Sequence, residues 1–249
     1  MRSRYPAAGN IAYSFGPGPL TPAVKALIIA NVALFLLRYA VPGLEVLLGL
    51  QPAAVFEQFK LWQPISYMFM HGGIGHILFN MLTLWMMGVE LERTWGTRFF
   101  TQFYFTAGIG AGITQMVLGL VPAPFADQFY YQSTIGASGA VFGLLLAYAM
   151  YFPHRTIYMY FLFPLQARYF VMILGAITLL LAVSGEGRGV AHTAHLGGLA
   201  AGYLYLKSGR IHPISELKYR FLKWRINRMR RKFDVYSGGR ADDVDRRVH

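Results

Sequence analysis

The sequence contains no cysteine, which excludes disulfide bonds and thiolate sites. Charged residues are also scarce: they make up 14% of the 249 residues, whereas a soluble domain has about 25%. The chain therefore lacks the polar surface of a soluble protein of this size. Hydrophobic residues make up 55% and gather in long blocks, a pattern that indicates a protein crossing the membrane several times.

Acidic residues are about half as numerous as basic ones, 11 against 23, and the formal net charge is +12. A charge of this size can indicate nucleic-acid binding. Here the lysines and arginines lie mostly in residues 207–249 and in short loops, so membrane orientation and binding of anionic lipid explain them better. We expect no nucleic-acid partner, and we expect residues 207–249 to form a basic cytoplasmic tail on the lipid surface.

The apolar blocks predict an all-α membrane protein with six spanning helices within residues 23–206. The expected spans are 23–41, 75–89, 98–120, 138–153, 169–183 and 190–206. Several are shorter than the roughly 20 residues that a full crossing needs. Short spans predict local thinning of the membrane, or helices that begin below its surface.

Two stretches outside these spans differ in character. Residues 1–22 are rich in proline and glycine and have no clear cleavage site, so we expect an irregular segment followed by a retained anchor. Residues 42–75 are too broken for a spanning helix and too apolar for a solvated loop, which predicts a first loop partly embedded in the membrane. We expect His71 to order this loop through the backbone, and Arg38 to extend toward the membrane surface.

Positive charge alternates between the loops. Arginines precede the first span (Arg2, Arg4) and lie between the second and third (Arg93, Arg98) and the fourth and fifth (Arg155, Arg168). The remaining loops hold few cations. The positive-inside rule therefore places both termini in the cytoplasm, and the second, fourth and sixth spans all run from the outer face inward.

The three spans that share this direction begin with unusual polar residues. The second carries His76 and, one turn later, Asn80; the fourth begins with Ser138; the sixth carries His192 and His195. Ionisable residues within spans are costly and usually functional. The sequence therefore predicts a polar cluster below the outer face.

Glycine spacing indicates which of these helices approach each other. Gly139 and Gly143 form a G-x-x-x-G face on the fourth span, and Gly198 and Gly202 form another on the sixth. Such faces let helix backbones come close. Packing of the two faces would bring Ser138 within reach of a histidine on the sixth span.

A serine becomes an effective nucleophile when a histidine takes its proton. His195 is the candidate base for Ser138, and since neither span carries a carboxylate, the pattern predicts a Ser–His dyad. Phe142, one turn after the serine, is expected to pack against the imidazole. His76, Asn80 and the backbone N–H of Ser138 can all donate hydrogen bonds to the oxyanion of an acyl-transfer reaction.

Three motifs resemble the signatures of the rhomboid intramembrane serine proteases, in the same order along the chain. They are His76-x-x-x-Asn80, Gly136-x-Ser138-Gly139 and Ala194-His195-x-x-Gly198-x-x-x-Gly202. Trp62 and His71 are placed as in the embedded first loop of that family, and Glu92-Arg93 followed by Gly96 is similar to its turn after the second span. The family often has tyrosine where Phe142 stands; phenylalanine keeps the ring.

This resemblance implies a six-helix rhomboid bundle of the bacterial type. Ser138 is implied as nucleophile, His195 as general base and acid, and His76, Asn80 and the Ser138 amide as the oxyanion hole. Gly136, Gly139, Gly198 and Gly202 are implied as supporting residues. The implied activity is a serine endopeptidase of the bacterial inner membrane, which cleaves transmembrane segments of other proteins near the outer face without a metal or cofactor.

Other interpretations stay open at this stage. Ser138 alone could be a small packing residue. The chain could be an inactive relative that binds and escorts membrane segments, although the intact serine and histidine argue against this. It could also be a small transporter with Ser138, His195 and His76 on a polar pathway, but the second, fourth and sixth spans turn apolar toward the cytoplasmic side.

Overall fold

The structure is a computed structural model that describes residues 16–159, 163–184, 189–208 and 223–224. The chain divides into two units, Met1–Leu206 and Lys207–His249, and the fold below is that of the first. Most of the predicted N-terminal segment and nearly all of the predicted basic tail lie outside the described residues. Expectations about the tail and its lipid contacts therefore remain predictions.

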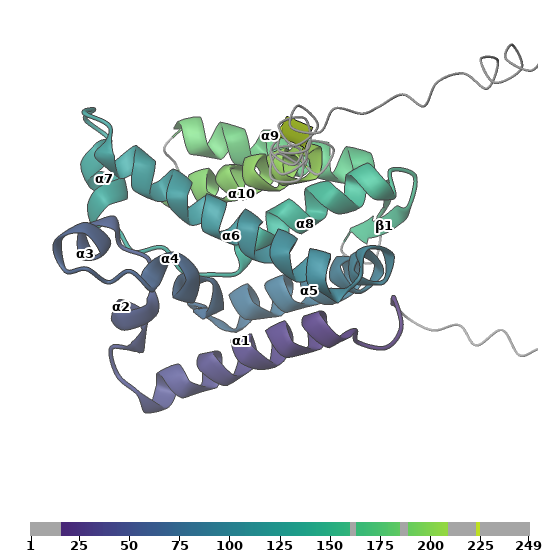
Figure 1. Cartoon of the computed structure of the whole chain (residues 1–249), viewed down its shortest axis with the longest axis horizontal. Coiled ribbons are helices and arrows are strands. Elements are labelled where there is room, and N and C mark those ends of the chain that lie inside the picture. The colour runs from purple at the N-terminus through teal and green to yellow at the C-terminus, as the bar shows by residue number, and fades with distance from the viewer. Residues whose placement is uncertain (1–15, 160–162, 185–188, 209–222, 225–249) are drawn as a thin grey trace, which may run out of the picture. The chain divides into compact units, whose positions relative to one another are not determined.

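Helices occur in all six stretches where the sequence predicts spans (Figure 1). They are α1 (Pro22–Ala40), α5 (Ile74–Trp95), α6 (Thr97–Leu120), α8 (Ser138–Tyr151), α9 (Ala167–Ser184) and α10 (Gly189–Ser208). Among the described residues, α1, α5, α6 and α9 are long and apolar enough to cross a membrane. A mostly helical fold with four candidate membrane-spanning helices is confirmed, and the count of six spans stays a prediction.

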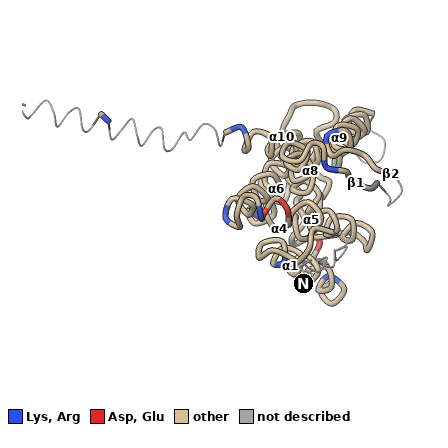
Figure 2. The backbone as a smooth tube through the Cα atoms, turned by 90° about the vertical axis from the view of Figure 1, so that its right-hand side faces the viewer, with Lys and Arg blue, Asp and Glu red and all other residues tan. Residues whose placement is uncertain are grey.

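The tube in Figure 2 shows how little charge this bundle carries, since most of its backbone is coloured as neither acidic nor basic. Helix α8 is apolar but has only 14 residues. Its length is therefore about 21 Å, less than the roughly 30 Å of a hydrocarbon core. This short helix fits the expectation of a span that begins below the surface.

Helix α8 lies at the centre of the bundle, where it contacts α5, α6 and α9. It buries eight residues, which include Gly139, Gly143 and Leu144. Helix α9 is the opposite case: it buries only Ala167, Val171 and Thr178 and exposes large apolar side chains along the rest of its length. An exposed apolar surface of this kind is suited to lipid, so α9 lies at the edge of the bundle.

The first loop folds into short helices rather than irregular chain. These are α2 (Leu44–Leu48), α3 (Pro52–Glu57), α4 (Gln63–Ser66) and the 3-10 helix η1 (Tyr67–Phe69). The buried side chain of Gln63 holds them together, because its oxygen accepts from the N–H of Gln51 and its amide donates to the carbonyls of Val46 and Leu47. Figure 1 shows this loop and the short helix α7 (Ala126–Tyr131) at one end of the bundle.

Sequence reasoning missed α7 and also a β-hairpin between α8 and α9. Strands β1 (Thr156–Met159) and β2 (Phe163–Gln166) pair antiparallel, with Thr156 opposite Gln166. The N–H of Ala167 donates to the carbonyl of Arg155 at 2.8 Å. The hairpin thereby fixes where α9 begins relative to the end of α8.

Helix α5 continues six residues beyond its predicted end and carries a buried carboxylate, that of Glu92. This carboxylate accepts hydrogen bonds from the N–H groups of Ala23 and Val24 and from the hydroxyls of Thr21 and Thr97. The first N–H groups of a helix lack partners within the helix, and here an acid from another helix supplies them for α1. Glu92 therefore ties the start of α1 to α5 and α6.

We predict that Glu92→Gln lowers the free energy of unfolding by about 1–3 kcal/mol, because an amide replaces a charged acceptor that serves four donors. Denaturant titration of the purified protein in detergent would measure this change. Glu57→Gln is the matched control, since Glu57 is exposed and its substitution should change stability by less than about 0.5 kcal/mol. Equal effects of the two substitutions would contradict a capping role for Glu92.

Candidate active site

Ser138 is the first residue of α8, and the segment before it is fixed by the first loop. Leu50 and Thr134 exchange two backbone hydrogen bonds of 2.9 and 2.8 Å. The N–H of Gly136 then donates to the carbonyl of Tyr67 at 2.9 Å. Because these bonds fix the extended chain up to the helix, the first loop determines where the serine is placed.

Gly136 makes the turn into α8 possible for two reasons. Its φ of +129° lies where residues with a side chain are strained. A Cβ atom at this position would also lie 2.7 Å from Nε2 of His76. The turn therefore passes directly over the His76 ring, and only glycine leaves room for both.

The side chains of Ser138 and His195 meet, with Oγ 2.7 Å from Nε2. Their helices approach backbone to backbone: a Cβ atom on Gly198 would lie 2.0 Å from the carbonyl oxygen of Gly139, and one on Gly202 would lie 3.2 Å from Cα of Gly143. The glycine faces expected from the sequence are thus in contact. A serine and a histidine at hydrogen-bond distance can act as nucleophile and base.

Helix α6 belongs to the same packing, which sequence reasoning did not identify. A Cβ atom on Gly139 would lie 2.5 Å from Cβ of Ala111, and one on Gly143 would lie 2.6 Å from Cβ of Ala107. The signal was present in the stretch from Ala107 to Gly112, where every residue except Ile109 is small. Small residues on all three helices allow α8 to be enclosed so closely.

The imidazole of His195 is oriented by an aromatic ring. The rings of Phe142 and His195 stack with centroids 4.1 Å apart and an angle of 9° between their planes. His192 lies farther from His195, at 6.1 Å between centroids and nearly perpendicular. The stacking fixes the plane in which His195 presents Nε2 to the serine. Neither α8 nor α10 carries a carboxylate that could orient the imidazole instead.

His76 presents its Nε2 toward the turn before Ser138. Its other ring nitrogen, Nδ1, accepts a hydrogen bond of 3.4 Å from the N–H of Gly72. A neutral imidazole that accepts at Nδ1 carries its proton on Nε2. His76 therefore has a donor, Nε2–H, on the side of the turn and the serine.

Asn80 and the start of α8 supply further N–H groups. The buried amide of Asn80 donates one hydrogen bond to the carbonyl of His76 at 2.8 Å, and a carboxamide has a second hydrogen to donate. The first helical bond of α8 runs from the N–H of Val141 to the carbonyl of Ala137. The N–H groups of Ser138 and Gly139 come before this ladder and are available to a ligand.

His71 links the first loop to the same turn. Its Nε2 accepts a long hydrogen bond of 3.5 Å from the N–H of Ala137, and its ring meets that of His76 edge-on at 4.9 Å. Burial is the main cause that lowers the pKa of His71 to about 4, and His76 lowers it further. The ring is therefore neutral at pH 7 and can accept, as the expectation of a loop-ordering residue requires.

Over the described residues, His, Cys, Asp and Glu side chains form no group of three that could hold a metal ion. The site consists instead of one hydroxyl, two imidazoles, an amide and backbone N–H groups. These groups can activate a nucleophile and stabilise an oxyanion.

Residues 58–209, more than half of the chain, match the family described as the rhomboid domain. RHOMBOID-like protein 4 of Arabidopsis thaliana is 33% identical over 165 residues, which cover 65% of this chain and 37% of that protein. Rhomboid protease GluP of Bacillus subtilis is 30% identical over 160 residues, 62% of this chain and 27% of that protein. Rhomboid-like protease 3 of Toxoplasma gondii is 28% identical over 156 residues, 63% of this chain and 54% of that protein. The chain thus spans about a quarter to a half of the length of these relatives.

We predict that Gly198→Ala destabilises the fold by about 2–3 kcal/mol, because the added methyl group meets a backbone carbonyl that cannot rotate away. Thermal unfolding in detergent would measure the loss. Gly175→Ala on α9 is the matched control, since a Cβ atom there meets nothing within 4 Å, and alanine favours the helix. If both variants unfold at the same temperature as the parent, the result contradicts close packing of α8 against α10 at Gly198.

Proposed function

This chain belongs to the rhomboid family, and we propose that it is an intramembrane serine endopeptidase with a Ser138–His195 dyad. The observation that carries the proposal is the 2.7 Å contact between Oγ of Ser138 and Nε2 of His195. Two of the relatives named above are called proteases. The proposed substrates are transmembrane or membrane-proximal segments of other membrane proteins.

In the proposed reaction, Oγ of Ser138 attacks the carbonyl carbon of the scissile peptide bond, and Nε2 of His195 takes the hydroxyl proton. The imidazolium then returns this proton to the leaving amine, so the peptide bond breaks and an acyl-enzyme remains. Water attacks the ester with His195 again as base, which releases the acid and restores the serine. The stacked ring of Phe142 keeps the imidazole in one plane through both transfers.

Attack by Ser138 places a negative charge on the former carbonyl oxygen of the substrate. Stabilising this charge needs hydrogen-bond donors on the side of the serine away from His195. We assign this role to Nε2–H of His76, the free amide hydrogen of Asn80 and the N–H of Ser138. Gly136 supports the assignment, since it lets the turn lie against His76. Donors fixed before the reaction stabilise the transition state more than mobile water does.

The site also has to accept an extended peptide. A helix hides its carbonyls in internal hydrogen bonds, so a transmembrane substrate has to unwind before Ser138 can attack it. Helix α8 is short, which supports a nucleophile placed below the membrane surface within reach of water. We assign cleavage to the outer face of a bacterial inner membrane, with six spans and both termini in the cytoplasm.

We predict that Ser138→Ala and His195→Ala each lower kcat for cleavage of a labelled transmembrane substrate by about 10³-fold or more. A fluorophosphonate should label the parent protein at Ser138 and leave Ser138→Ala unlabelled. Ser184→Ala is the control, because that hydroxyl is on the exposed end of α9. Binding of the substrate without cleavage by the parent would instead favour an inactive escort protein.

Loss of an oxyanion donor should have a smaller effect than loss of the nucleophile. We predict that His76→Ala and Asn80→Ala each lower kcat by about 10²–10³-fold while KM changes little, because the donors act mainly on the transition state. Steady-state kinetics in detergent would test this. If Asn80→Ala has the same kcat as the parent, Asn80 is not part of the oxyanion hole.

A further inference from the structure

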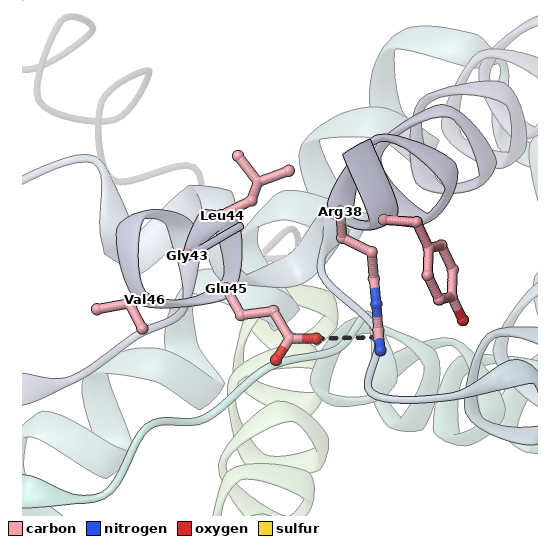
Figure 3. A pocket seen from close by; sticks show the side chains of 6 residues that line it. Arg38, Gly43, Leu44, Glu45 and Val46 are labelled. Atoms are coloured by element: carbon pink, nitrogen blue, oxygen red, sulfur yellow. Dashed lines mark ion pairs between the residues drawn. The ribbon is translucent and has the colours of Figure 1, made fainter. Parts of the chain in front are cut away.

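Arg38 lies in the last turn of α1, and its side chain has bonding partners that the sequence did not predict. Its guanidinium donates hydrogen bonds to the carbonyls of His71 and Gly72, in the loop just before α5. It also forms an ion pair of 2.9 Å with Glu45, as Figure 3 shows. The side chain is only 17% exposed, so Arg38 joins three separate segments of the chain.

The surroundings of Arg38 fix it in this position. Its guanidinium lies 5.1 Å from the ring centroids of both Phe35 and Tyr39, a distance at which cation–π attraction contributes. Gly43 adopts a φ of +82°, and the resulting turn brings Glu45 back toward the end of α1. A cavity of about 350 Å³ lies beside this group, lined by Arg38, Tyr39 and residues 43–46.

The loop that Arg38 holds carries the groups around the candidate active site. His71 accepts from the N–H of Ala137, immediately before Ser138. The N–H of Gly72 donates to Nδ1 of His76, and this bond leaves the proton on Nε2. The two carbonyls bound by Arg38 thus belong to the two residues that fix the turn and the His76 ring.

Two glycines between the buried His71 and the start of α5 have few packing contacts of their own. They are Gly72 and Gly73, and glycine has the most backbone freedom to lose. A Cβ atom would meet nothing within 4 Å at Gly73, and only the tip of Ile135 at Gly72. Since close packing does not fix these glycines, polar bonds have to do so, and Arg38 bonds the carbonyl of Gly72 and that of the adjoining His71.

We infer that Arg38 is a positioning residue for the oxyanion hole. It holds the carbonyls of His71 and Gly72 and thereby orders the loop that fixes the His76 ring and the turn before Ser138. This inference rests on the proposed protease function. The planar guanidinium donates to two carbonyls and a carboxylate together, whereas a lysine ammonium is a point charge without this fixed geometry. Arg38→Lys should therefore restore only part of the function.

The first test measures kcat and KM for cleavage of a labelled transmembrane substrate in detergent. Arg38→Ala should lower kcat about 10-fold, less than the loss of a donor itself, with KM within about twofold; Arg38→Lys should be intermediate. Arg98→Ala is the matched control, because it removes the same charge from an exposed position at the start of α6. An unchanged kcat in Arg38→Ala, or an equal loss in Arg98→Ala, would overturn the inference.

A double-mutant cycle with His76→Ala separates positioning from general destabilisation. If Arg38 acts through His76, Arg38→Ala should lower kcat much less in the His76→Ala background than in the parent. If the variant only weakens the fold, the two losses should multiply. Multiplied losses would overturn the inference.

Hydrogen–deuterium exchange over residues 70–76 tests the tether without relying on activity. Arg38→Ala should speed exchange in this segment and leave α9 unchanged. Unchanged exchange in 70–76, in a protein that cleaves substrate, would overturn the role of Arg38. A different result would be faster exchange in Arg38→Ala together with a parent protein that shows no Ser138-dependent cleavage. It would overturn both the proposed function and the positioning role of Arg38, and would leave Arg38 as a structural tether only.

Discussion

The contact between the backbones of α8 and α10 is the constraint on which the candidate site depends. At Gly139 and Gly198 no atom larger than hydrogen fits between the helices, and this closeness places Ser138 at 2.7 Å from His195. Ala107 and Ala111 of α6 close the other side of α8. Association of helices within lipid gains little from hydrophobicity and relies on such close packing, so the same residues that stabilise the bundle also position the reacting groups.

The other half of the site depends on hydrogen bonds rather than on packing. Backbone bonds from Leu50 and Tyr67 fix the segment before the serine, while Arg38 and His71 connect the first loop to it. In a chain with so few charges, the buried carboxylate of Glu92 accepts hydrogen bonds from four donors. An unpaired polar group is costly in lipid, and the bonds of Glu92 join α5 to the starts of α1 and α6.

The sequence predicted the features that depend on local pattern. Apolar runs located all six helices, and glycine spacing indicated the approach of Ser138 to His195. It did not predict features that depend on partners elsewhere in the chain. The α8–α9 hairpin requires strands that carry no strong alternation, and the contribution of Ala111 depends on how α6 faces α8. Arg38 was interpreted from its place at a helix end, since its carbonyl partners come together only in the folded loop.

The proposed dyad joins residues 57 positions apart, Ser138 on α8 and His195 on α10. Chains fold largely from the N-terminus during synthesis, so Ser138 and the proposed donors His76 and Asn80 are synthesised before His195. A nascent chain that holds α8 without α10 has a hydroxyl and no base. Under the proposed mechanism, peptide cleavage begins only once α10 is in place, so the order of synthesis couples proteolysis to assembly of the helices that carry the site.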